Sequence, residues 1–289
     1  MVLRVRASVR VGGRVRWLER SPDGLHLVAA LDLRHPVYAP VCSPIVGLAR
    51  GPSGLAITCT LREPALAVFA LDDGAVIRVA ADDEEVVLHR HDATDHAWRI
   101  AGGQALDTPQ VALLASGREM YVAIGDRDDG HGYTEPVYST SHQTIDLRTG
   151  AAANAHAPGG VVRGPGVSTL SPHAADPRVA AVIARFPFRQ EWAICVGPTR
   201  LLTTSRLIAW HDATTLRGDA PASWVGRAYL DLSADERLVA APTATGIRIE
   251  RDDGVDDLVL GSSATCAIFL GATELAVGTA GGDVHVLAL

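Results

Sequence analysis

The feature that most constrains this 289-residue chain is a strand, turn, strand unit that recurs along it. Short apolar runs alternate with turn-forming sequences, such as Ser-Pro-Asp-Gly at 21–24, Asp-Asp-Gly at 72–74 and Asp-Asp-Gly at 252–254. Glycine in such turns supplies the positive φ that a tight hairpin requires. Almost no segment has the i, i+3, i+4 apolar spacing of an amphipathic helix over three turns. The sequence therefore predicts an all-β chain built of hairpins.

Several segments share one pattern, in which a strand, a short polar turn and a second strand of small residues follow each other. They begin at Trp17 (WLERSPDGLHLVAAL), Gly47 (GLARGPSGLAITCTL), Ala112 (ALLASGREMYVAIG) and Tyr229 (YLDLSADERLVAAP). Residues 193–205 and 267–279 match more closely, with Ala, Ile, Gly, Thr and Leu in the same register. Their starts are about two repeats apart, for a repeat of about 35 to 45 residues.

A third strand often follows and ends in a polar turn, as in ALAVFALDDG (65–74), HQTIDLRTG (142–150), RLIAWHDATT (206–215), GIRIERDDG (246–254) and DVHVLAL (283–289). This order of strands and turns resembles that of the blades of the WD40-like β-propeller family. SPDGLHLVAA (21–30) resembles the turn between the first two strands of a blade, and TIDLRTG (144–150) resembles the end of the third. The family's Trp-Asp pair is absent, because Trp210 is followed by His211.

The resemblance implies one β-propeller domain over residues 1–289, built of four-stranded antiparallel blades. Dividing the length by seven gives about 41 residues, a usual blade length, so we expect seven blades, with six as the alternative. In such proteins one blade usually combines strands from both ends of the chain, which closes the ring. Residues 2–9 (VLRVRASV) are therefore expected to form the outer strand of the blade that contains 267–279 and 283–289.

All 26 basic residues are arginine, a bias that a GC-rich bacterial genome would explain. The net charge of -7 argues against nonspecific nucleic-acid binding, which depends on cationic side chains. Arg4, Arg6 and Arg10 fall at even positions of an alternating stretch, so one strand face would present all three. We expect an exposed arginine face on an outer strand; the alternative is a docking surface for an acidic partner.

Neither a secretory signal nor a membrane-spanning run is found in the sequence. The four cysteines, Cys42, Cys59, Cys195 and Cys266, have no metal-ligand spacing. These observations predict a reduced, cytoplasmic protein that does not associate with membranes.

A histidine-rich stretch, HRHDATDH (89–96), permits a metal site. His89 and His91 would share one strand face, and His96 with Asp92 or Asp95 would complete a zinc-like set. The letters HDAT recur at 211–214 without a companion histidine nearby, and both copies follow an expected third strand. The favoured interpretation is that Asp and Thr stabilise a turn, with no metal or other cofactor.

Catalytic motifs are absent: the sequence has no Gly-x-Ser-x-Gly, no phosphate-binding loop and no His-Glu-x-x-His. Aromatic and arginine side chains, which dominate interface hot spots, gather at Arg185, Phe186, Phe188, Arg189 and Trp192, and a second candidate surface carries Tyr133 and Tyr138. We therefore expect a noncatalytic scaffold that binds a protein or peptide, in a multi-protein bacterial system. The alternative is a small-molecule-binding or metal-assisted hydrolase propeller with its site in the central channel.

Overall fold

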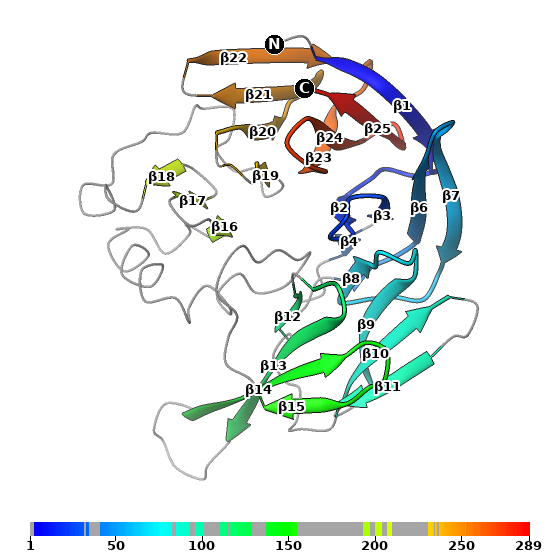
Figure 1. The fold of residues 1–289 in the computed structure, drawn as a ribbon, viewed down its shortest axis with the longest axis vertical. Coiled ribbons are helices and arrows are strands. Elements are labelled where there is room, and N and C mark those ends of the chain that lie inside the picture. Colours follow the sequence, from blue (N-terminus) through cyan, green and yellow to red (C-terminus); the bar gives the residue numbers. More distant parts are fainter. Residues whose placement is uncertain are drawn as a thin grey trace.

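Strands joined by turns make up the computed structural model of the chain (Figure 1). The structure describes residues 3–31, 33–34, 41–82, 85–92, 96–100, 110–114, 116–128, 137–154, 193–196, 200–203, 207–209, 231–233, 235, 237–251 and 253–289. Within these ranges every regular element is a β-strand, as the hairpin pattern predicts.

Four-stranded antiparallel sheets are the main unit of the described chain, which contains five of them. Four of these consist of β2 (Trp17–Arg20), β3 (His26–Ala30), β6 (Ile45–Gly51) and β7 (Gly54–Leu61); β8 (Ala67–Ala70), β9 (Val76–Asp82), β10 (Glu85–His91) and β11 (His96–Ile100); β12 (Gln110–Leu113), β13 (Glu119–Asp128), β14 (Val137–Asp146) and β15 (Ala152–Asn154); and β19 (Asp231–Leu232), β20 (Val239–Pro242), β21 (Gly246–Arg251) and β22 (Gly254–Val259). A three-stranded sheet contains β16 (Ala193–Val196), β17 (Arg200–Thr203) and β18 (Leu207–Ala209), and a small hairpin contains β4 (Leu33–Arg34) and β5 (Val41–Cys42).

The fifth four-stranded sheet joins the two ends of the chain. Its order is β1 (Arg4–Arg10), β25 (Asp283–Ala288), β24 (Glu274–Thr279) and β23 (Ala264–Phe269). β1 runs antiparallel to β25, with Arg4 opposite Ala288 and Arg10 opposite Asp283. The ends of the chain lie close together in Figure 1. The outer-strand position predicted for residues 2–9 is therefore the one that β1 occupies.

Two of the four-stranded sheets show a buried edge strand and an exposed edge strand. All four residues of β8 are buried, whereas the described side chains of β11, at the other edge of its sheet, are exposed or partly exposed. The same contrast separates β23 from β1. Arg4, Arg6 and Arg10 are exposed on β1, but the expectation that one strand face presents all three was wrong. A bulge between Val5 and Ala7 interrupts the alternation, so Arg4 lies opposite Ala288 and Arg10 opposite Asp283, on different faces of the sheet.

Among the described residues the hydrophobic core lies between neighbouring sheets, and a single inner strand can contribute to two parts of it. On β8, Ala67 and Phe69 pack with residues of β12 to β14, whereas Val68 and Ala70 pack with residues of β3 and β6. Because successive side chains of a strand point to opposite faces, both faces of the sheet are covered. A strand buried on both faces reads as a continuous apolar run, which explains the small-residue strands of the sequence.

The predicted turns are present, but two segments occupy a different rank in their sheets. Residues 65–74 were expected to form a third strand and instead contain β8, the first strand of its sheet. The segment from Gly47 was expected to form first and second strands and instead forms β6 and β7, the third and fourth. Both expectations were wrong because Gly-containing turns follow first strands and third strands alike. The sequence of a turn therefore does not show which strand of the sheet precedes it.

Candidate functional site

The turns that follow the first strands of successive sheets touch one another on one face of the molecule. The backbone N–H of Asp23 donates to Asp72 Oδ1 at 2.9 Å, which links the turns of two neighbouring sheets. A Cβ on Gly117 would lie 3.0 Å from Pro22 Cγ, and one on Gly24 would lie 2.5 Å from the Leu270 carbonyl oxygen. Glycine therefore allows these turns to pack closely, and a continuous line of contacts runs across four sheets.

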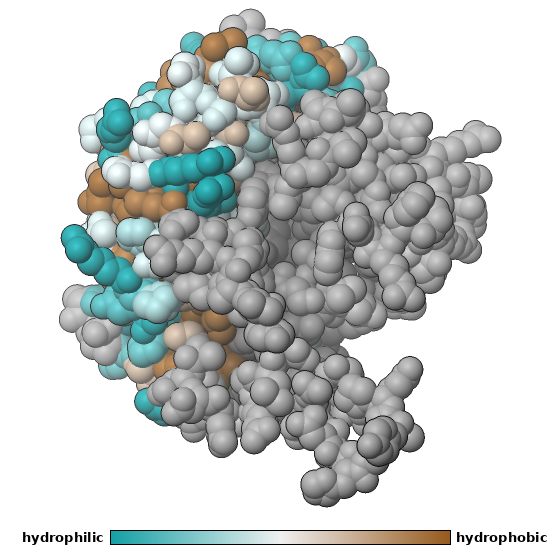
Figure 2. Space-filling view, turned by 180° about the vertical axis from the view of Figure 1, so that it is seen from behind, coloured by the Kyte–Doolittle hydropathy of each residue, from teal (hydrophilic) through white to brown (hydrophobic). Residues whose placement is uncertain are grey.

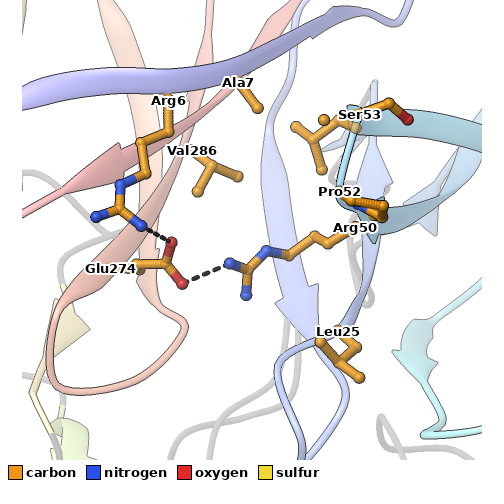
Figure 3. Close-up of a pocket in the computed structure, with 11 residues that line it drawn as sticks. Arg6, Ala7, Leu25, Arg50, Pro52, Ser53, Glu274 and Val286 are labelled. Atoms are coloured by element: carbon orange, nitrogen blue, oxygen red, sulfur yellow. Dashed lines mark hydrogen bonds and ion pairs between the residues drawn. The ribbon is translucent and has the colours of Figure 1, made fainter.

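A groove of about 610 Å³ opens on this face between the sheet that contains β1 and the sheet that contains β2. We call it the seam groove, because it lies where the first and last strands of the chain meet. It is lined by Arg6, Ala7, Leu25, Arg50, Gly51, Pro52, Ser53, Gly54, Leu55, Glu274 and Val286 (Figure 3).

Three charged side chains meet in the seam groove. Arg50 Nη2 donates to Glu274 Oε2 at 2.5 Å, and Arg6 Nη1 donates to Glu274 Oε1 at 3.3 Å (Figure 3). Arg50 also donates from Nη1 to the Gly24 carbonyl at 2.7 Å. Glu274 thus joins β24 to β6 in the neighbouring sheet and to β1 in its own sheet.

Exposure differs sharply between the two arginines. The Arg50 side chain is 19% exposed and the Arg6 side chain is 51% exposed, whereas Glu274 is 21% exposed. Leu25, at the same groove, is 51% exposed although it is aliphatic. The groove therefore offers an accessible arginine side chain and, elsewhere in its lining, an accessible apolar side chain.

A second groove, of about 760 Å³, lies between the sheet of β8 to β11 and the sheet of β12 to β15. It is lined by Leu71, Asp72, Asp73, Arg90, Asp92, His96, Ser116, Gly117, Arg118, Asp146, Leu147 and Arg148. Like the seam groove, it is lined by the turns after first strands and by the ends of third strands. The two grooves therefore open on the same face.

Arg90 corresponds to Arg50, since each is the second-last residue of the third strand in its sheet. Arg90 bonds to Asp73 in the first turn of its own sheet, as Arg50 bonds to Gly24, and its Nε donates to Asp92 Oδ2 at 2.5 Å. Burial opposes the charged form of Arg90, but the hydrogen bonds that it donates to Asp73 and Asp92 prevail and raise its pKa. An arginine at this position thus fixes the third strand to the first turn in both sheets.

Asp146 ends the third strand at the second groove. Its Oδ1 accepts hydrogen bonds from the backbone N–H groups of Thr149 and Arg148, at 2.7 Å and 2.9 Å, and from the Thr149 hydroxyl at 2.9 Å. These bonds hold the pKa of Asp146 below its ordinary value, the backbone bond from Thr149 contributing most. The segment TIDLRTG therefore forms the turn that the sequence predicts, and Asp146 serves that turn.

The histidines considered as metal ligands are divided between the two faces of a sheet. The rings of His89 and His91 stack with centroids 6.0 Å apart, so they share a face as predicted. His96 lies opposite Arg90 across β10 and β11, and residues directly opposite share a face. Because Arg90 alternates with His89 and His91, His96 lies on the other face. The described residues contain no group of three His, Cys, Asp or Glu side chains suited to a metal ion.

Other predicted site residues lie beyond what the structure describes. Arg185, Phe186, Phe188, Arg189, Trp192 and Tyr133 are outside the described residues. Tyr138 is a residue of β14 and lies opposite Arg127 in register. Arg50, Glu274 and Arg90 were not predicted as site residues, since no local motif marks them.

Free thiols in the described residues include Cys59 and Cys266. Cys266 is buried between sheets, and burial raises the pKa of its thiol to about 12. It therefore stays protonated near neutral pH and behaves as a small apolar side chain. No helix in the part of the chain covered by the structure has the length and hydrophobicity to cross a membrane.

No protein-family model and no curated protein matches the sequence. Solved structures do resemble the fold. The WD40 β-propeller domain of Doa1 aligns with a TM-score of 0.52 and 9% identity, over 99% of this chain and 97% of that chain. The WD40 domain of Neurospora crassa Pan2 has the same score and identity, over 99% and 95%. Chaetomium thermophilum Raptor aligns with a TM-score of 0.52 and 14% identity, over 98% of this chain and 28% of that chain. The fold of the chain therefore resembles that of these β-propeller domains.

Proposed function

We propose that the chain is a noncatalytic scaffold that binds a protein or peptide partner on the face where the two grooves open. The observation that carries the proposal is the pair of equivalent grooves, each lined by turns from two neighbouring sheets. Grooves of several hundred cubic ångströms accommodate a few side chains of a partner. The fold supports the proposal only by analogy, because one fold serves many functions.

Rigid walls favour this use of the grooves. The strands that end at them are buried against neighbouring sheets, and ion pairs and hydrogen bonds fix their turns. A preformed groove loses little conformational entropy when a partner binds, so more of the contact energy appears as affinity.

Seven blades and a closed ring, within one domain over residues 1–289, complete our proposal for the whole chain. The described residues supply five four-stranded sheets and one three-stranded sheet. Residues 155–192, which lie outside the described residues, are about as many as one repeat of this class contains, about 40. The pairing of β1 with β25 supports closure through the ends of the chain.

Aromatic and arginine side chains near residue 190 are proposed as a further contact with the partner: Arg185, Phe186, Phe188, Arg189 and Trp192, together with Tyr133 and Tyr138. Their residue types support this role, since Trp, Tyr and Arg are enriched at interface hot spots. A cytoplasmic, bacterial multi-protein system, without nucleic acid or membrane, is the setting that we propose from composition and charge.

Photo-crosslinking tests the proposed binding face. A photoreactive phenylalanine analogue would replace Ser53 at the seam groove, Ser116 at the second groove, or Val259 on the outer strand β22, which is 71% exposed. In cells that naturally contain the protein, we expect one partner to crosslink from Ser53 and Ser116 and not from Val259. Equal crosslinking from all three positions, or none from the two grooves, would refute the proposed face.

A combined replacement of Phe186, Phe188, Arg189 and Trp192 by Ala tests the further contact. We expect the crosslinked partner to be lost while the melting temperature stays unchanged. Undiminished crosslinking in a folded variant would remove these four residues from the proposal.

A further inference from the structure

We propose that the seam groove recognises a carboxylate side chain of an acidic partner segment, and that Arg6 donates the hydrogen bonds. This inference rests on the proposed function and names the chemistry of the partner. It also gives a role to one of the exposed arginines of β1, a strand for which the sequence offered an acidic partner as an alternative.

Charge complementarity is the first support. Among the residues that line the groove, Arg6 and Arg50 are cationic and Glu274 is anionic. The groove therefore carries one net positive charge in a chain whose net charge is -7. One added carboxylate would neutralise it.

The unequal engagement of the two arginines is the second support. Arg50 is held at both Nη atoms, by Glu274 and by the Gly24 carbonyl, and its side chain is largely covered. Arg6 has a single contact within the described chain, at 3.3 Å, and half of its side chain is exposed. A guanidinium has five N–H donors, so Arg6 keeps donors for a planar, two-pronged interaction with a carboxylate.

Glu274 acts in this arrangement as an internal counter-ion. Figure 3 shows Arg6 and Arg50 pointing to the same carboxylate from β1 and from β6. A partner carboxylate would compete with Glu274 for Arg6, while Arg50 would keep its shorter bond to Glu274. The resident carboxylate therefore weakens the binding of an acidic ligand, and its removal should strengthen that binding.

The groove lining favours a partner segment that carries an apolar residue as well as an acidic one. Leu25, which lines the same groove, is 51% exposed. Burying an aliphatic side chain against Leu25 would add hydrophobic stabilisation to the ion pair. Phosphate or nucleic acid fits less well, because their greater negative charge would remain uncompensated beside Glu274 and within an anionic protein.

Fluorescence anisotropy with synthetic peptides tests the inference. The probe is a fluorescein-labelled peptide with two Leu-Glu pairs between Gly-Ser flanks; matched peptides carry Gln or phosphoserine in place of each Glu. We expect the Glu peptide to bind about tenfold more tightly than the Gln peptide, as one charge-assisted pair would give, and more tightly than the phosphoserine peptide.

Two variants and one control assign the interaction. Arg6→Gln should weaken binding of the Glu peptide about tenfold. Arg10→Gln removes the same charge from the same strand outside the groove, so it should change the affinity less than about twofold. Glu274→Gln should tighten binding although it removes an ion pair from the fold. A residue with only a structural role would not strengthen binding when it is replaced.

The opposite results overturn the inference. These are no binding of the Glu peptide at millimolar concentration, equal binding of the Gln peptide, tighter binding of the phosphoserine peptide, or weaker binding to Glu274→Gln. Crosslinking from Ser53 in the Arg6→Gln variant separates the two proposals. If the Arg6→Gln variant still crosslinks its partner from Ser53 and the peptides show no preference for Glu, only the acidic ligand is refuted. If the unaltered protein gives no crosslinking from either groove, the proposed scaffold function is refuted as well.

Discussion

At the scale of single residues, Gly150 meets two demands that only glycine satisfies. Its φ is +74°, and a Cβ there would lie 2.1 Å from Cδ1 of Trp98 in the neighbouring sheet. Gly150→Ala should therefore lower the free energy of unfolding by about 2 to 4 kcal/mol, about 1 for the backbone and the rest for displacing Trp98. Urea unfolding measures this difference.

Gly12 provides the matched control for that substitution. Its φ is +85°, but a Cβ there would meet nothing within 4 Å. Gly12→Ala should therefore cost only the backbone term, about 1 kcal/mol. If both variants lose the same free energy of unfolding, the clash with Trp98 does not contribute to the loss of stability.

Turn chemistry was predictable at this scale, and the charged groups of the grooves were not. Ser21 Oγ donates to Asp23 Oδ1 at 2.5 Å, and Ser233 Oγ donates to Asp235 Oδ1 at 2.6 Å, so two turns with the same letters form the same bonds. In each turn the serine Oγ also accepts a hydrogen bond from the backbone N–H five residues later, and local side-chain chemistry of this kind is visible in a sequence. Arg50 and Glu274 are separated by 224 positions, and only the packing of first and last sheets brings them together.

At the scale of the strand, the pairing of β1 with β25 contains a pH-sensitive group. The His285 ring is partly buried, with Nδ1 2.6 Å from Ser8 Oγ on β1, and burial lowers the pKa of His285 below its ordinary 6.5. The unfolded chain therefore takes up a proton more readily than the folded one. Stability contributed by neutral His285 is present above pH 6.5 and is lost as the pH falls below that value.

His285→Gln tests this dependence. The unaltered protein should lose more stability than the variant between pH 7 and about pH 5.5, a range above that in which Asp146 and Asp257, whose pKa values are lowered, would be protonated. Urea unfolding at each pH provides the comparison. Parallel pH profiles for the two proteins would show that another group is responsible.

β25 is the strand on which the terminal sheet depends. It lies between β1 and β24, and Val284, Val286 and Leu287 are each at most 3% exposed. Removing three buried aliphatic side chains costs about 2 to 5 kcal/mol each, a sum comparable with the total stability of about 5 to 15 kcal/mol of a typical domain. Deletion of the last six residues, Val284–Leu289, should therefore unfold the protein.

Deletion of residues 1–10 is the comparison, because it removes only the outer strand β1 and leaves β23, β24 and β25 paired. This variant should fold with reduced stability, as seen in its circular dichroism and thermal melt. A soluble protein that melts cooperatively without residues 284–289 would contradict the role of β25. The hairpin pattern and the family resemblance predicted the pairing of β1 with β25. They did not predict the positions of β6, β7 and β8 within their sheets correctly.

At the scale of the whole molecule, the described part of the chain is stabilised by contacts between sheets rather than by one central core. Four buried clusters each join two neighbouring sheets, and β23 illustrates the arrangement with Ile268 facing one neighbour and Phe269 the other. Small apolar patches alternate with hydrophilic residues over the described surface in Figure 2. A repeated hairpin pattern predicts such an architecture, whereas the position of the grooves follows from how the turns of adjacent sheets meet.

Circular permutation tests this organisation. The first residues of β1 lie beside the last residues of β25, so a linker of about six Gly and Ser residues should join Leu289 to Met1. Opening the chain between Asp253 and Gly254, in an exposed turn, makes β22 the first strand and β21 the last. These two strands would then pair as β1 and β25 do now, in the neighbouring sheet. The permutant should therefore be soluble and melt in a single cooperative transition.

A second permutant, opened between Ala240 and Ala241, is the control, because both residues are 0% exposed in the inner strand β20. Cutting there places two charged termini in the interior between sheets, at a cost that the remaining contacts cannot offset. We expect insoluble or unfolded protein, as judged by circular dichroism. If both permutants fold equally well, or neither folds, the equivalence of the terminal sheet and the β19 to β22 sheet is wrong, and β1 with β25 would form a junction unlike any other in the molecule.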